Sequence, residues 1–158
     1  MVLGIGTCDI IKSRGYMNKS EFVEICLWKS PRPKKYYLDN SEESIINISK
    51  KALLTNSEET KISLLTSLNG VSIAVASSIL TMIYPEKYGV IDIRAWQILH
   101  LYGEVKEKPQ GKGFDSQDWL NYLIILRKYA IDFNIKVRDI EVILFFSHKK
   151  VQTGRLYN

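Results

Sequence analysis

The sequence predicts an all-α fold, a bundle of six to eight helices around one core. Apolar residues recur at helical spacing through most of the chain, and residues that cap or stop helices separate these apolar segments. The 158 residues are 46% hydrophobic, and a chain of this length buries roughly 70% of its unfolded surface in one domain. We therefore expect a single domain over residues 1–158.

The first predicted helix begins with a capping box. Asn18 supplies an acceptor side chain and Glu21 follows three residues later, a pattern in which each side chain satisfies a backbone amide at the helix start. Pro31 ends this helix, because proline has no amide for the helical ladder and restricts the residue before it. Asn40 with Glu43 predicts a second capping box and the next helix.

The third and fourth helices are expected to form a hairpin at about residues 59–84. Ser57 opens the third helix, and Gly70 ends it because glycine tolerates the left-handed conformation of a helix terminus. The fourth helix, over residues 71–83, carries apolar side chains on most of its faces. This pattern is typical of a helix in the centre of a fold. Pro85 follows its end.

Three further helices are expected in the second half of the chain. Asp92 opens the first and Gly103 closes it, and a polar loop over residues 104–114 leads to the next helix, which begins at Asp115. The last segment, residues 137–147, contains an apolar run whose periodicity fits a buried helix or a strand. Its helical neighbours and the lack of a strand partner in the sequence favour a helix.

Two features near the C-terminus are expected to have no specific role. Glu141 is predicted to face water on the polar side of the last helix, and residues 148–158 are predicted to form a basic tail. His100 and His148 have no partners at the spacing of metal ligands, so no metal site is expected.

Charge and cysteine content narrow the classes of function. The net charge of +5 favours an anionic partner without identifying one. Cys8 and Cys26 are too few for a zinc site of cysteines or an iron–sulfur cluster, and are typical of reduced thiols in a cytosolic protein. No apolar run approaches the length of a membrane span. We expect a cytoplasmic protein with no membrane partner.

The turn at residues 70–72 has the properties of a phosphate site. The first amides of the following helix lack intrahelical partners, and the positive end of the helix dipole lies beside them. Gly70 allows close approach to the backbone, and Ser72 adds a hydroxyl donor. Such contacts hold a nucleic-acid backbone without reading its bases. A hairpin that serves only helix packing has the same spacing, and this alternative stays open.

From about residue 62 to residue 101, a quarter of the chain, the sequence resembles the helix-hairpin-helix DNA glycosylase superfamily, which contains endonuclease III. The family hairpin reads Leu-x-Gly-Val-Gly-x-x-x-Ala, and residues 68–76 read Leu-Asn-Gly-Val-Ser-Ile-Ala-Val-Ala. The family aspartate lies in an apolar-Asp-x-His/Arg context, and residues 91–94 read Ile-Asp-Ile-Arg. The distance in sequence between the hairpin and this aspartate also agrees with endonuclease III-like members.

The resemblance implies a monofunctional glycosylase that acts on double-stranded DNA, with Asp92 as its catalytic carboxylate. Bifunctional members carry a lysine at the position of Ala74, so the hairpin Schiff-base nucleophile is missing here. No four-cysteine cluster loop is present, and no cofactor is expected apart from a monovalent cation that the turn carbonyls of Thr66, Leu68 and Val71 can hold in this family. The residues expected to bind DNA through the hairpin are Gly70, Val71, Ser72, Ile73 and Ala74.

The chemistry of such a site requires a carboxylate. Breaking a base–sugar bond develops positive charge on the deoxyribose, and a carboxylate stabilises this cation and orients the attacking water. Asp92 is also a good helix N-cap, a role worth about 1 kcal/mol, and capping alone is the alternative. The target base must leave the stack for a pocket. The candidate pocket residues are Trp28, Tyr84 and Trp96, for each of which core packing is the alternative.

Two basic segments are further candidates for DNA contact. Residues 29–37 combine four cations with two tyrosines, a composition that suits a phosphate backbone and also suits an ordinary solvated loop. The cations are Lys29, Arg32, Lys34 and Lys35. The segment at residues 110–113 lacks the pattern of a phosphate-binding P-loop and is expected to be a flexible connection within reach of DNA.

Three hypotheses therefore remain from the sequence. The chain is a base-excision glycosylase, a non-catalytic helix-hairpin-helix DNA-binding module, or a helical protein-interaction domain in which the hairpin only packs.

Overall fold

The computed structural model describes residues 6–152 and 156, and the regular elements in this part of the chain are nine helices. The all-α prediction is confirmed. The number of helices exceeds the predicted six to eight because two short ones, α1 and α3, lack a capping side chain that the sequence could reveal. The helices are α1 (Thr7–Arg14), α2 (Lys19–Lys29), α3 (Lys34–Asp39), α4 (Glu42–Leu54), α5 (Glu58–Thr66), α6 (Ile73–Ile83), α7 (Ile93–Leu101), α8 (Ser116–Phe133) and α9 (Val137–Val151).

Helix α6 lies at the centre of the fold, as its apolar pattern predicts. It packs against α1, α2, α5 and α8. Most of its side chains are buried, including the polar ones at Ser77, Ser78 and Thr81. These hydroxyls donate to carbonyls of the preceding turn, so their burial leaves no donor unsatisfied.

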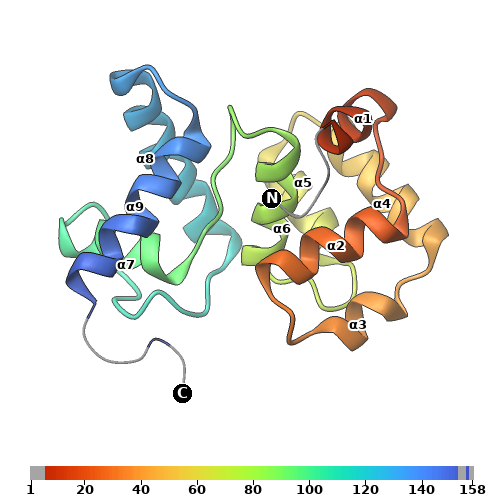
Figure 1. Cartoon of the computed structure of the whole chain (residues 1–158), viewed down its shortest axis with the longest axis horizontal. Coiled ribbons are helices and arrows are strands. Elements are labelled where there is room, and N and C mark those ends of the chain that lie inside the picture. The colour runs from red at the N-terminus through yellow and green to blue at the C-terminus, as the bar shows by residue number, and fades with distance from the viewer. Residues whose placement is uncertain (1–5, 153–155, 157–158) are drawn as a thin grey trace.

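The helices form two groups, α1 to α6 on one side and α7 to α9 on the other (Figure 1). Helix α9 packs on α7 and α8, while α8 reaches across to α5 and α6. Buried residues of both groups belong to one continuous hydrophobic cluster. At the junction the Tyr88 ring stacks on Trp119 with centroids 6.1 Å apart, and the Tyr122 hydroxyl donates to the Val90 carbonyl at 2.8 Å. These contacts fix the segment that leads from α6 to Asp92.

Local capping predictions succeed with one exception. The Asn18–Glu21 capping box at the start of α2 is present, and the Ser57 side chain caps α5. The second box, predicted at Asn40, is wrong. Ser41 caps α4 by accepting from the amide of Ser44 at 3.1 Å, and the Asn40 side chain is engaged in a contact with the hairpin turn.

The predictions for the C-terminal segment need correction. Glu141 does not face water: its side chain is buried, because this face of α9 packs against the remainder of the fold. Helix α9 also continues to Val151, and the buried His148 hydrogen-bonds to Gln97 of α7. The predicted basic tail is therefore wrong for residues 148–151, and most of its remainder lies outside the described residues. Across residues 6–152, no helix combines the length and apolar character that crossing a membrane requires.

Candidate functional site

The turn between α5 and α6 is held from both sides. Gly70 has a φ of +80°, and a Cβ atom there would lie 2.9 Å from Cδ1 of the buried Tyr37 ring. On the other side, Asn40 bonds both polar groups of the Asn69 backbone: its Oδ1 accepts from the amide at 2.8 Å and its Nδ2 donates to the carbonyl at 3.1 Å. The turn that the sequence identifies is thus supported by α3 and by the residue that follows it.

The first turn of α6 presents backbone donors at the surface. Ser72 is the exposed N-cap, and its Oγ accepts from the amide of Val75 at 3.2 Å. Its hydroxyl proton remains able to donate to a ligand. The amides of Ile73 and Ala74 belong to the first turn, where no intrahelical acceptor exists. Val71 is buried in the hydrophobic core, so its side chain holds the turn against the fold and does not face a ligand.

Asp92 is the N-cap of α7, and both of its carboxylate oxygens have partners. Oδ1 accepts from the amide of Arg94 at 2.8 Å, and Oδ2 accepts from Nζ of Lys29 at 2.7 Å. The whole residue is only 6% exposed. The ion pair joins the end of α2 to the start of α7, two segments that lie far apart in the sequence.

A short hydrogen-bond chain connects the Asp92 segment to the start of α6. The amide of Ile91 donates to Oγ of Ser77 at 3.0 Å, and the same hydroxyl donates to the Ala74 carbonyl at 2.7 Å. The carboxylate therefore has a fixed position relative to the first turn of the hairpin helix.

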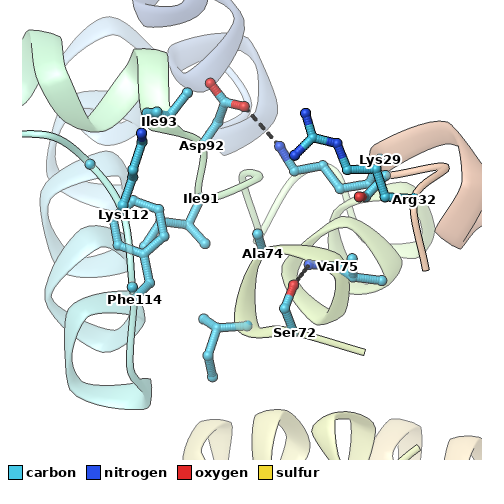
Figure 2. A pocket seen from close by; sticks show the side chains of 14 residues that line it. Lys29, Arg32, Ser72, Ala74, Val75, Ile91, Asp92, Ile93, Lys112 and Phe114 are labelled. Carbon is cyan, nitrogen blue, oxygen red and sulfur yellow. Dashed lines mark hydrogen bonds and ion pairs between the residues drawn. The ribbon is translucent and has the colours of Figure 1, made fainter. Parts of the chain in front are cut away.

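The start of α6 and the Asp92 carboxylate line one cavity of about 500 Å³, which we name the phosphate cavity after the ligand that we propose for it below (Figure 2). Gly70 and Val71, also predicted to bind DNA, do not line it. Figure 2 shows Lys29 and Arg32 on one side of it and Lys112 with Phe114 on the other, so the cavity has cationic side chains on two sides. The lining residues are Lys29, Ser30, Arg32, Ser72–Val75, Ile91–Ile93 and Gly111–Phe114.

A second cavity of about 340 Å³, which we name the inner cavity, also includes Asp92. Lys29 and Asp92 line both cavities, so their ion pair lies where the two meet. The inner cavity is lined by Trp28, Lys29, Val90, Asp92, Arg94, Arg138, Glu141, Val142 and Phe145.

Glu141 is the deepest titratable group of the inner cavity. Burial raises the pKa of this carboxyl to about 7, although the neighbouring Arg138 guanidinium acts in the opposite direction. Its carboxylate forms a short ion pair with Arg138. The sequence placed Glu141 on the polar face of α9, and only the packing of α9 shows that this face is enclosed.

The three residues predicted to form the base pocket lie in different parts of the structure. Trp28 lines the inner cavity, whereas Trp96 is buried in the core, where its Nε1 donates to the carbonyl of Lys108 at 3.0 Å. Tyr84 lies at the opposite end of α6 from Ser72. Neither Trp96 nor Tyr84 lines one of the two cavities that contain Asp92.

The four basic residues predicted to contact DNA also lie in different places. Lys29 and Arg32 line the phosphate cavity, whereas Lys34 and Lys35 are exposed at the start of α3 and do not line it. Lys112, from the loop expected to be a flexible connection, lines this cavity too. The neighbouring Gly111 backbone lies against Ile93 at the start of α7, so this part of the loop is packed.

Comparison with family models, curated proteins and solved structures gives no match. Among the described residues, no cluster of three or more His, Cys, Asp or Glu side chains could hold a metal ion. The function is therefore inferred from the chemistry of the two cavities and from the predicted hairpin.

Proposed function

We propose that this chain binds double-stranded DNA through the hairpin turn and hydrolyses the N-glycosidic bond of an extruded nucleotide, with Asp92 as the essential carboxylate. One observation carries the proposal: the Asp92 carboxylate and the start of α6 line the same cavity. A base-excision site needs an anchored backbone phosphate and an acid beside the adjacent sugar, and this cavity contains groups suited to both tasks.

The phosphate cavity suits an anion of the DNA backbone. Amides of the first turn of α6 and the positive end of its dipole form a phosphate site, and the Ser72 hydroxyl adds a donor. Arg32 and Lys112 supply charge on two sides. These groups contact the backbone alone, so the phosphate cavity positions the duplex without selecting a sequence.

Asp92 is placed to act on the sugar of the anchored nucleotide. Departure of the base leaves positive charge on the deoxyribose, which a nearby carboxylate stabilises while it orients the attacking water. Oδ1 is fixed by the Arg94 amide, and Oδ2 is held by Lys29. A DNA phosphate that attracts the Lys29 ammonium would release Oδ2 for the sugar. Ala74 carries no amine, so the hairpin supplies no nucleophile; in the proposed reaction water attacks and the product strand keeps its abasic site.

A non-catalytic DNA-binding module is the second candidate. The observation that favours it is that capping and ion pairing occupy both Asp92 oxygens in the unbound protein, which gives this residue a structural role independent of catalysis. This candidate shares the phosphate cavity with the enzyme and differs only in the need for an ionised Asp92.

The test is single-turnover incubation of the protein with duplexes that each contain one damaged or mismatched base. We expect an abasic product from at least one duplex, and we expect Asp92→Asn to reduce its formation about 10²–10⁴-fold, the range of a lost acid–base group. Asparagine caps a helix almost as well as aspartate but cannot ionise. Asp115→Asn is the matched control, since Asp115 caps α8 outside both cavities.

The outcomes separate the three hypotheses. Excision that persists in the folded Asp92→Asn variant removes Asp92 from the mechanism. Binding without product from any duplex supports the non-catalytic module, provided that affinity falls with salt by about 0.9 log units per neutralised phosphate. If the protein does not bind DNA, the protein-interaction domain is the hypothesis that remains. Borohydride trapping of product complexes also distinguishes hydrolysis by water from attack by the Lys29 amine.

A further inference from the structure

The inner cavity lies on the far side of the Lys29–Asp92 ion pair from the start of α6. Because this pair lines both cavities, a nucleotide with its phosphate in the phosphate cavity and its base in the inner cavity would place its sugar beside Asp92. The inner cavity, at about 340 Å³, falls within the range of about 300–1,000 Å³ typical of small-ligand pockets.

Two aromatic side chains from different helices line the inner cavity. Trp28 comes from α2 and Phe145 from α9, and both are only partly buried. A guanidinium lies over each ring: Arg138 is 5.5 Å from the Trp28 centroid, and Arg94 is 5.1 Å from the Phe145 centroid. Aromatic rings and guanidinium planes are the surfaces on which extruded bases stack.

The polar groups of the inner cavity contain more donors than acceptors. The Glu141 carboxyl is buried and pairs with Arg138. The buried Nε of Arg94 has no acceptor within the described part of the chain. Arg94 also lines the inner cavity, so a ligand that places an acceptor beside its guanidinium gains a charge-assisted hydrogen bond. The cavity thus presents three cations, Lys29, Arg94 and Arg138, beside two carboxyls, Asp92 and Glu141. Lys29 pairs with Asp92 and Arg138 pairs with Glu141, so the Arg94 guanidinium is the cation in excess.

We propose that the inner cavity binds the extruded base and selects a neutral base with a lactam edge, a carbonyl oxygen next to a ring N–H. Uracil, thymine, hypoxanthine, guanine and oxidised guanine belong to this class. The carbonyl oxygen has two lone pairs for the guanidinium donors, and the ring N–H donates to Glu141. The inference rests on the proposed function only in that the ligand is a base of DNA.

The same groups disfavour two other classes of base. The amino edge of adenine pairs an N–H₂ donor with a ring nitrogen that accepts one hydrogen bond, so it satisfies fewer of the guanidinium donors. Cytosine keeps a carbonyl at C2 but lacks the ring N–H at N3, and this N–H is the donor that uracil offers to Glu141. The three cations of the cavity outnumber its two carboxyls, so the excess positive charge opposes binding of an alkylated, cationic base.

The test measures binding, so that it does not depend on excision. Duplexes carry hypoxanthine or adenine, or uracil or cytosine, opposite a tetrahydrofuran abasic analogue, which leaves every test base without a pairing partner. Anisotropy titrations use the Asp92→Asn protein, because it should retain the base. We expect about tenfold tighter binding of the lactam member of each pair, and we expect a duplex with 7-methylguanine to bind no better than one with adenine.

Variants connect this preference to the inner cavity. Glu141→Gln should abolish the lactam preference, and Arg94→Gln provides a second variant in case the first is poorly folded. The matched control is Glu59→Gln, which changes charge equally at an exposed position of α5. The inference would be overturned if hypoxanthine bound no tighter than adenine and uracil no tighter than cytosine. It would also be overturned if the folded Glu141→Gln and Arg94→Gln proteins both kept the preference for the lactam base.

The two proposals fail in distinguishable ways. A lactam preference without excision by the wild-type protein supports the inner cavity as a base site and rejects the enzyme. Excision of an amino-edge or cationic base supports the enzyme and rejects the lactam assignment. Absence of DNA binding rejects both.

Discussion

Replacing Gly70 with alanine should destabilise the protein by about 2–5 kcal/mol. One part of this loss is conformational, since an L-residue in the left-handed region costs about 1–2 kcal/mol, and Gly70 has a φ of +80°. The other part is steric, because the new Cβ would lie 2.9 Å from Cδ1 of Tyr37 and 3.0 Å from Cβ of Tyr36. Overpacking of this kind costs about 1–3 kcal/mol.

The Tyr37 ring has little freedom to move away from that Cβ. It is fully buried, packs edge-on against Phe22 with centroids 6.2 Å apart, and donates its hydroxyl to the Ser30 carbonyl at 3.0 Å. We therefore expect the steric part of the loss to be realised as destabilisation and as displacement of the turn. The same displacement should weaken DNA binding by the folded variant.

Gly103→Ala is the matched control. Gly103 has a φ of +77°, yet a Cβ there would meet no described heavy atom within 4 Å, so only the conformational cost of about 1–2 kcal/mol applies. Urea unfolding followed by circular dichroism gives the free energy of unfolding for both variants. Equal destabilisation by the two substitutions would refute the packing of the turn against Tyr37.

Three further perturbations test the site. Glu141 has a pKa raised to about 7 from an ordinary 4.5, so the native state keeps a proton that the unfolded chain loses. The free energy of unfolding, measured by urea unfolding at each pH, should fall by up to about 3 kcal/mol as pH rises from 4.5 to 7. Glu141→Gln should weaken this pH dependence, and an unchanged pH dependence in the variant contradicts a raised pKa at Glu141. Asn40→Asp removes the side-chain amide that donates to the Asn69 carbonyl, so the free energy of unfolding, measured by calorimetry, should fall by about 1–3 kcal/mol. An unchanged free energy of unfolding contradicts a structural role of Asn40 in the turn. Ser72→Ala should lose about 1 kcal/mol of capping energy and weaken DNA binding, and full affinity in filter binding would exclude the hydroxyl as a phosphate donor.

The sequence alone determines the helices because their signals are local. Apolar periodicity and capping residues act within one or two turns, so the starts of α2, α5, α7 and α8 are correctly predicted. Helices α1 and α3 are missed because neither has a side-chain cap and each is eight residues or fewer. The predicted cap at Asn40 fails for a different reason: its side chain bonds to Asn69, far along the chain, and Ser41 replaces it.

The site depends on contacts that local patterns do not specify. The sequence identifies the turn at Gly70 and the carboxylate at Asp92, but only the packing of α2 beside α6 brings Lys29 to that carboxylate. The packing of α9 against α7 likewise turns Glu141 from an expected surface residue into a buried acid beside Arg138. Helical periodicity shows which face of a helix is apolar, whereas side-chain packing between distant helices decides which polar groups share a cavity.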